Sequence, residues 1–116
     1  MAILESKVQQ DVLKRLRKLG CYVYKNAQNM YTEKGRPDLT ACVPIKGNGD
    51  SIIGLFVGIE LKRPGRLNGV SEAQEVVGRA IRKAGGLWIL SDDSEYIETL
   101  IKNIQEGNYD DTIDNN

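Results

Sequence analysis

The sequence predicts a single α/β domain in which a mixed central β-sheet is flanked by helices. The chain has 116 residues, of which 41% are hydrophobic, and this is enough for one core and too little for two. Segments with the 3.6-residue period of helices and segments with the alternation of strands follow one another in the order α-β-β-β-α-β-α. We expect one domain over residues 1–105 and a disordered tail over 106–116, which is acidic and poor in large apolar residues.

The first helix is expected over residues 5–19. Its apolar positions recur at spacings of four, four and three, and Gly20 stands where the residue after a helix often lies. Glu5 projects in line with this apolar stripe, which is an unusual place for a carboxylate. A favourable position near the positive end of the helix dipole accounts for Glu5 equally well. The stripe consists of Val8, Val12, Leu16 and Leu19.

Three strands are expected next, over residues 21–25, 38–45 and 55–62. A polar stretch separates the first strand from the second. A glycine-rich turn separates the second from the third, and such a turn between two alternating segments indicates an antiparallel hairpin.

The remaining elements are a helix, a strand and a helix. Ser71 is expected to cap the first of these, because Gln74 three residues later completes a capping box. The short strand over 87–90 is continuously apolar, which is typical of burial on both faces, and its position after a helix favours parallel pairing. Asp92 or Ser94 is expected to cap the last helix. The apolar faces of the two helices contain Ala73, Val76, Val77, Ala80, Ile81 and Ala84 in one and Ile97, Leu100, Ile101 and Ile104 in the other.

The charges are divided unequally along the chain, although their sum is zero. Residues 1–90 contain 15 basic and 8 acidic residues, a net charge of +7, and residues 91–116 contain 1 basic and 8 acidic residues, a net charge of −7. The zero sum therefore does not count against a nucleic-acid partner. We expect the elements before residue 90 to form any surface that faces DNA.

Composition excludes several kinds of chemistry. The chain has no histidine, so a Ser-His-Asp triad, a His-ligated zinc site and a histidine general base are excluded. Cys21 and Cys42 have no metal-ligand spacing and are expected to be buried, inert thiols, as in a reducing compartment. Neither a signal peptide nor a membrane span is recognisable, so the protein is expected to be intracellular.

Acidic residues stand at positions that the strand pattern does not require. Alternation along the third strand places Glu60 and Lys62 on one face, and the start of its antiparallel partner brings Asp38 near them. Gly58 on the same face indicates either a close approach by another group or a bulge. Carboxylates that converge repel one another unless a cation lies between them, and Mg²⁺ takes one or two carboxylates together with water and phosphate oxygens. Lys62 would orient or deprotonate a water, or bind a phosphate, so the pattern favours phosphodiester cleavage.

Three motifs give the chain a resemblance to a known family. They are Gly35-Arg36-Pro37-Asp38-Leu39, then Glu60-Leu61-Lys62, then Ser71-Glu72-Ala73-Gln74. Their order and spacing resemble the signature of the PD-(D/E)xK nucleases, and specifically of the VRR-NUC branch, over roughly residues 3–101. The resemblance implies a restriction-endonuclease-like core, the same order of elements and metal-dependent DNA cleavage.

The resemblance also implies roles for individual residues. Asp38 and Glu60 would bind Mg²⁺ or Mn²⁺, together with the backbone carbonyl of Leu61. Lys62 would be the catalytic lysine, and Glu5 would reach the metal through water.

The second helix and the basic loops would complete this implied site. Gln74 would face it and contact Lys62 or the phosphate, and Ser71 would contact DNA in addition to its capping role. The basic residues expected to contact phosphates in both loops are Lys34, Arg36, Arg63 and Arg66.

The substrate and partners are expectations of the same kind. Small members of this family are often viral or bacterial, which implies the cytoplasm of a bacterial or phage-infected cell. They are associated with branched DNA such as four-way (Holliday) junctions, and a homodimer would supply a larger DNA surface. A non-catalytic nucleic-acid-binding module with the same fold is the main alternative, and a small protein-interaction domain is the third. Tyr22, Tyr24, Tyr31 and Trp88 are expected mostly in core or dimer packing, with base stacking as the alternative.

Overall fold

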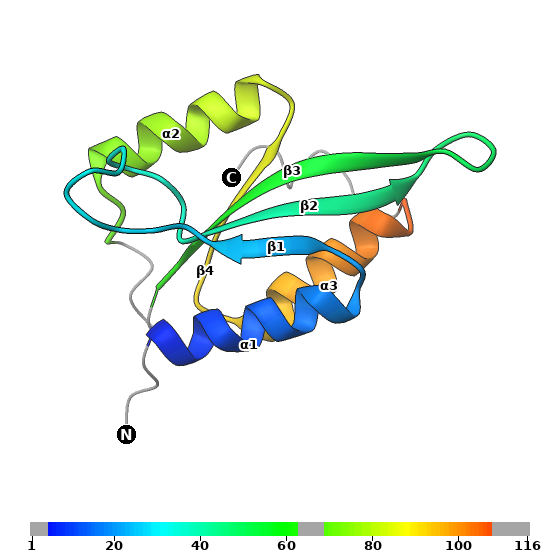
Figure 1. Ribbon diagram of the computed structural model, residues 1–116, viewed down its shortest axis with the longest axis horizontal. Coiled ribbons are helices and arrows are strands. Elements are labelled where there is room, and N and C mark those ends of the chain that lie inside the picture. The colour runs from blue at the N-terminus through cyan, green and yellow to red at the C-terminus, as the bar shows by residue number, and fades with distance from the viewer. Residues whose placement is uncertain (1–4, 63–68, 108–116) are drawn as a thin grey trace.

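The computed structural model describes residues 5–62 and 69–107, together with their side chains except that of Glu5. The elements follow the predicted order α-β-β-β-α-β-α, and the predicted fold class, a mixed sheet flanked by helices, is confirmed (Figure 1). The elements are α1 (Glu5–Lys18), β1 (Tyr22–Lys25), β2 (Leu39–Lys46), β3 (Ile52–Leu61), α2 (Glu72–Lys83), β4 (Leu87–Ser91) and α3 (Ser94–Gln105).

The four strands form one sheet in the order β1-β2-β3-β4. β2 pairs with β1 and with β3 in antiparallel directions, as the hairpin prediction requires. β4 pairs with β3 in parallel, which confirms the expected crossover through α2. β3 begins at Ile52 instead of at residue 55, because Ile52, Ile53 and Gly54 continue the pairing with the end of β2.

The helices α1 and α3 cover one face of the sheet (Figure 1). The core lies between them and that face, and it contains the predicted apolar stripes of both helices. Leu16 of α1 and Ile101 of α3 are fully buried, as is Val57 at the centre of β3. Burial of such side chains is the main favourable term in folding, so this face supplies most of the stability.

The other face is covered only in part, by α2 lying over β3 and β4 (Figure 1). Gly78 lets α2 approach the sheet closely, because a Cβ atom there would lie 2.5 Å from the ring of Trp88. The apolar face expected on this helix is only partly buried: Val76, Ala80 and Ala84 are exposed. Because α2 covers this face only in part, the β4 side chains are fully buried only on the α1/α3 face. Trp88, on the α2 face, is half-buried.

Three smaller expectations also differ from the structure. Asp93, not Asp92 or Ser94, caps α3, because its carboxylate accepts hydrogen bonds from the first backbone N–H groups of that helix. Cys21 is buried, and burial raises the pKa of its thiol to about 11. Cys42 is exposed on the part of the sheet that α2 leaves uncovered, called the open half below. The tyrosines Tyr22, Tyr24 and Tyr31 are likewise exposed, not packed in the core.

No helix in the described part of the chain is both long and apolar enough to cross a membrane. The predicted tail lies almost wholly outside the described residues, since the structure describes the chain only as far as residue 107. Within the described part of that segment, Glu106 is the C-cap of α3.

Candidate active site

The candidate site lies in a row of residues that crosses the sheet from strand to strand. The strand pairing ends with Lys25 opposite Leu39 and Leu39 opposite Ile59. Extending it by one residue would place Asn26 opposite Asp38 and Asp38 opposite Glu60. Directly opposed residues share a face and have Cβ atoms about 5 Å apart. This extension would put Asp38 beside Glu60 on the face that α2 covers.

Asp38 directly precedes β2 and makes a side-chain contact with β3. Its Oδ2 accepts a hydrogen bond of 2.7 Å from the backbone N–H of Leu61. This bond to the residue directly after Glu60 holds the Asp38 carboxylate at the end of β3.

Asn26 holds the backbone on which Asp38 stands. Its side-chain amide donates to the carbonyl of Pro37 at 2.9 Å and to the hydroxyl of Thr40 at 2.7 Å. Its own backbone N–H donates to the carbonyl of Asp38 at 2.9 Å. Asn26 is 8% exposed, so these bonds form away from bulk water, where losing a partner is costly.

Sequence reasoning missed Asn26 because an asparagine after a short strand is an ordinary turn residue. A signal was nevertheless present. Extending the antiparallel pairing by one residue beyond the first strand would have placed Asn26 opposite Asp38. The buried Asn26 amide holds the backbone on both sides of Asp38, the candidate metal ligand. Asn26 is therefore a positioning residue.

Glu60 is almost fully buried, with 1% of its surface exposed, and α2 supplies a hydrogen bond to it. The side-chain NH₂ of Gln74 donates to Glu60 Oε1 at 2.8 Å. The family resemblance implied a contact of Gln74 with Lys62 or a phosphate, and in the structure its partner is Glu60.

Gln74 reaches Glu60 because the capping box of α2 holds its side chain. The carbonyl oxygen of its amide accepts from the backbone N–H of Ser71 at 2.8 Å, and the Ser71 hydroxyl accepts from the Gln74 backbone N–H at 3.1 Å. One amide thus joins the start of α2 to β3. The capping box and the contact with the site coexist.

Two glycines allow the surrounding segments to come close to the site. Gly35 has a φ of +89°, and a Cβ atom there would lie 2.3 Å from the backbone oxygen of Ala73. The loop before Asp38 therefore rests directly on the start of α2. Gly58 is approached by Pro37 and Ile81, at 2.8 and 2.9 Å from the position of a Cβ atom. The predicted close approach at Gly58 is present, and β3 runs through it in unbroken register with β2.

The other predicted site residues are placed less completely. Lys62 follows β3, is partly exposed, and donates from its backbone N–H to Ser91 at 3.1 Å. Lys34 and Arg36 are exposed on the loop that carries Gly35. The side chain of Glu5, and all of Arg63 and Arg66, lie outside the described residues.

The donor set suits a hard divalent cation. Asp38 and Glu60 offer carboxylate oxygens from adjacent strands, and Mg²⁺ is commonly held by one or two carboxylates while water and phosphate oxygens complete its shell. Among the side chains that the structure describes, no group of three His, Cys, Asp or Glu residues forms a larger cluster. The fit therefore rests on two carboxylates.

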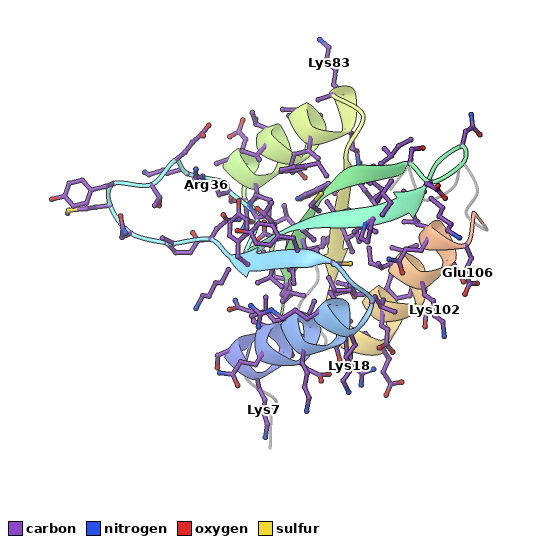
Figure 2. The ribbon with its side chains drawn as sticks, turned by 45° about the vertical axis from the view of Figure 1, so that its right-hand side comes forward. Lys7, Lys18, Arg36, Lys83, Lys102 and Glu106 are labelled. Atoms are coloured by element: carbon purple, nitrogen blue, oxygen red, sulfur yellow. The ribbon has the colours of Figure 1, made fainter. Side chains whose placement is uncertain are left out.

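The last turn of α1 carries Arg15, Arg17 and Lys18, and Arg15 is engaged in ion pairs. Arg15 lies 2.9 Å from Asp11 in α1 and 3.0 Å from Glu98 in α3. Lys7 and Lys18 point away from the sheet on this helix, far from α2 (Figure 2). The acidic helix α3 therefore partly neutralises α1, whereas Lys34 and Arg36 of the β1–β2 loop line a hollow together with Gln74.

Comparison with known proteins gives one informative likeness. No family model matches the chain, and no curated protein matches it. The site belongs to an α/β fold in which carboxylates meet at the ends of two adjacent strands. A solved structure described as "VRR_NUC domain" matches with a TM-score of 0.64 and 22% sequence identity, over 84% of this chain and 94% of that chain. The chain therefore has the fold of a VRR-NUC domain, as the motif resemblance predicted.

Proposed function

We propose that the protein is a metal-dependent DNA endonuclease that hydrolyses phosphodiester bonds in branched DNA, such as four-way junctions. The observation that carries the proposal is the placement of the Asp38 carboxylate against the end of β3, at the backbone of the residue that follows Glu60. Lys62 follows two residues later on the same strand end. The likeness to a structure described as a VRR-NUC domain supports a nuclease over other uses of such a site.

The roles of the residues follow from their chemistry. Asp38 and Glu60 would hold Mg²⁺ or Mn²⁺, with the backbone carbonyl of Leu61 and, through water, Glu5. When bound, the metal would act as a Lewis acid on the scissile phosphate and favour ionisation of water. Lys62 would hold the attacking water or the phosphate.

The second group of roles concerns orientation and DNA contact. Gln74 would orient the Glu60 carboxylate through their 2.8 Å hydrogen bond. Lys34 and Arg36 would contact phosphates beside the cut, together with Ser71 and with Arg63 and Arg66. Such contacts bind DNA without reading its sequence, which suits a structure-selective enzyme.

A homodimer forms part of the proposal, and the open half of the sheet supports it. Phe56 of β3 and Val76 of α2 are 49% and 53% exposed and line an apolar hollow of about 430 Å³. Contiguous exposed apolar side chains on a small protein commonly mark an interaction surface. Sedimentation equilibrium tests this: Phe56→Ser should shift a dimer to monomers, and a monomeric wild type would rule the dimer out.

The activity is tested with a panel of labelled four-way junction, flap, duplex and single strand. Wild-type protein should cut the junction in Mg²⁺ or Mn²⁺ and not in EDTA. Asp38→Asn should abolish cleavage, and Lys62→Ala should lower the rate by about a hundredfold to ten-thousandfold. Matched controls lie in the same hairpin: Asp50→Asn and Lys46→Ala alter exposed residues at its far end and should leave cleavage unchanged.

Each outcome separates the hypotheses. Undiminished cleavage by both site variants would contradict the assignment of the site. A wild type that shifts the junction in a gel but never nicks it would instead identify a nucleic-acid-binding module. Protein that neither binds DNA nor binds Mn²⁺ would favour a protein-interaction domain.

A further inference from the structure

The loop between β1 and β2 ends in a turn that carries two very exposed apolar side chains. Met30 is 84% exposed and Tyr31 is 90% exposed. Among the large hydrophobic residues that the structure describes, these two are the most exposed, and they are adjacent. The loop reaches away from the sheet, with Arg36 nearer its base (Figure 2).

Hydrogen bonds within the turn hold these side chains in place. The Asn29 carboxamide oxygen accepts from the Tyr31 backbone N–H at 2.8 Å. The Asn29 carbonyl accepts from both the backbone N–H and the hydroxyl of Thr32, at 3.1 and 2.8 Å, and the Thr32 hydroxyl accepts from the Asn29 N–H at 3.2 Å. A closed turn presents its tip at a low entropic cost, and such pre-organisation favours binding.

The base of the same loop belongs to the candidate active site. Gly35 rests on the start of α2, and Asp38 ends the loop. A hollow of about 480 Å³ lies between the loop and α2, and it is bordered by Asn29 on one side and Gln74 on the other. Gln74 is the residue that donates to Glu60. The hollow therefore lies between the loop that carries the exposed tip and Gln74, the residue that contacts Glu60.

The charge of the loop indicates which partner the tip meets. Lys34 and Arg36 are exposed on it, and Lys25 is exposed at the end of β1 beside it, against one exposed carboxylate, Glu33, and the site residue Asp38. An apolar tip flanked by these exposed cations suits a base stack bordered by phosphates. Tyrosine stacks on bases of any sequence, and methionine is among the apolar residues that enter base steps.

We propose that the turn formed by Asn29, Met30, Tyr31 and Thr32 binds an unpaired or terminal base at the branch point of the DNA substrate, with the Tyr31 ring stacked on that base. The inference rests on the proposed function and adds how the substrate is chosen. A base at a branch is already partly unstacked, so it costs less to engage than a base inside a duplex. The distance from the turn to Asp38 then determines how far from the branch the cut falls.

The test uses full-length protein and a four-way junction with 2-aminopurine at the branch, first in EDTA so that no cleavage occurs. Wild type should change the 2-aminopurine fluorescence on binding. Tyr31→Ala should abolish that change and weaken junction affinity by about 5- to 150-fold, the loss expected for one base–aromatic stack. Tyr31→Phe should retain both. Tyr96→Ala, which removes a tyrosine 52% exposed on α3, should behave as wild type.

A second arm measures cleavage in Mn²⁺ and the mass of the free protein. Tyr31→Ala should cut at scattered positions and lose its preference for the junction over duplex, with unchanged mass. Equal affinity, fluorescence and cut position for Tyr31→Ala and wild type would overturn the inference, as would a change in mass, which would assign the tip to a protein contact. Failure of the proposed activity is distinct: the wild type would then show the stacking signal in EDTA and cut nothing in Mn²⁺.

Discussion

The two faces of the sheet are built from alternate residues of the same strands, and they differ in polarity and in burial. On the face covered by α1 and α3, the strand side chains are apolar and buried. On the face of α2, the same strands carry Gly58, Glu60 and Thr40, and exposed aromatic side chains lie beside them. The comparison indicates that one face stabilises the fold and leaves the other free to hold carboxylates, whose burial is costly.

The largest expected effect separates the two faces by stability. Leu16→Ala on α1 removes a fully buried side chain and should lower the free energy of unfolding by about 2–5 kcal/mol. Phe56→Ala on the open half removes a side chain that is 49% exposed and should cost less than half as much. Urea denaturation of both variants measures the difference. Equal losses would mean that the open half is as important for folding as the core.

The next effect tests how the loop before Asp38 is seated. Gly35→Ala should destabilise the protein by about 1–3 kcal/mol from backbone strain and also reduce cleavage, because its Cβ would meet the backbone of Ala73. Gly49 is a matched control, with a φ of +66° and nothing within 4 Å. Gly49→Ala should show the strain alone and cleave normally. If the two variants cleave alike, the contact with α2 is not what seats the loop.

Asn26 tests whether the α2 face depends on its buried polar bonds. Asn26→Ala leaves the Pro37 carbonyl and the Thr40 hydroxyl without this donor, and it should cost about 1–3 kcal/mol of stability. It should also raise the Mn²⁺ concentration needed for half-maximal cleavage, because the side-chain bonds that hold Pro37 and Thr40 on either side of Asp38 are lost. Asn48→Ala, at an exposed turn position, is the control. A loss of stability with an unchanged Mn²⁺ requirement would make Asn26 purely structural.

The smallest effect concerns the α1/α3 side and pH. A hydrogen bond from the Ser94 hydroxyl, and next the Arg15 guanidinium, lower the pKa of Asp11 below its usual value. Because the folded-state pKa is the lower one, this stabilisation is present at neutral pH and is lost as the pH falls below about 4 and through the folded-state pKa. Asp11→Asn should therefore cost at most about 1 kcal/mol at pH 7.

Urea denaturation of Asp11→Asn at pH 7 and pH 3 measures this dependence. The difference from wild type should shrink at pH 3, where the wild-type carboxylate begins to take up its proton. Asp50→Asn, at an exposed turn position, should match wild type at both pH values. A difference between Asp11→Asn and wild type that grows on acidification would reverse the assigned sign.

The candidate site was predictable where it depends on strand pairing. Alternation along β3 and the short hairpin turn are local properties, and together they were enough to bring Asp38 toward Glu60. The contact between Gln74 and Glu60 was not predictable, since it requires the distance from α2 to the sheet. That distance depends on the close packing of Trp88 against Gly78, a contact that no local sequence pattern predicts.

The sequence by itself determined the order of elements, the division of each strand into an apolar and a polar side, and the pairing that joins the two carboxylates. These follow from periodicity and register, which depend only on neighbouring residues. The tertiary structure alone decided that Asn26 clamps Asp38, that Arg15 pairs with α3, and that α2 leaves half of one face uncovered. The physical reason is range: hydrogen bonds and close packing depend on tenths of an ångström between segments far apart in the chain.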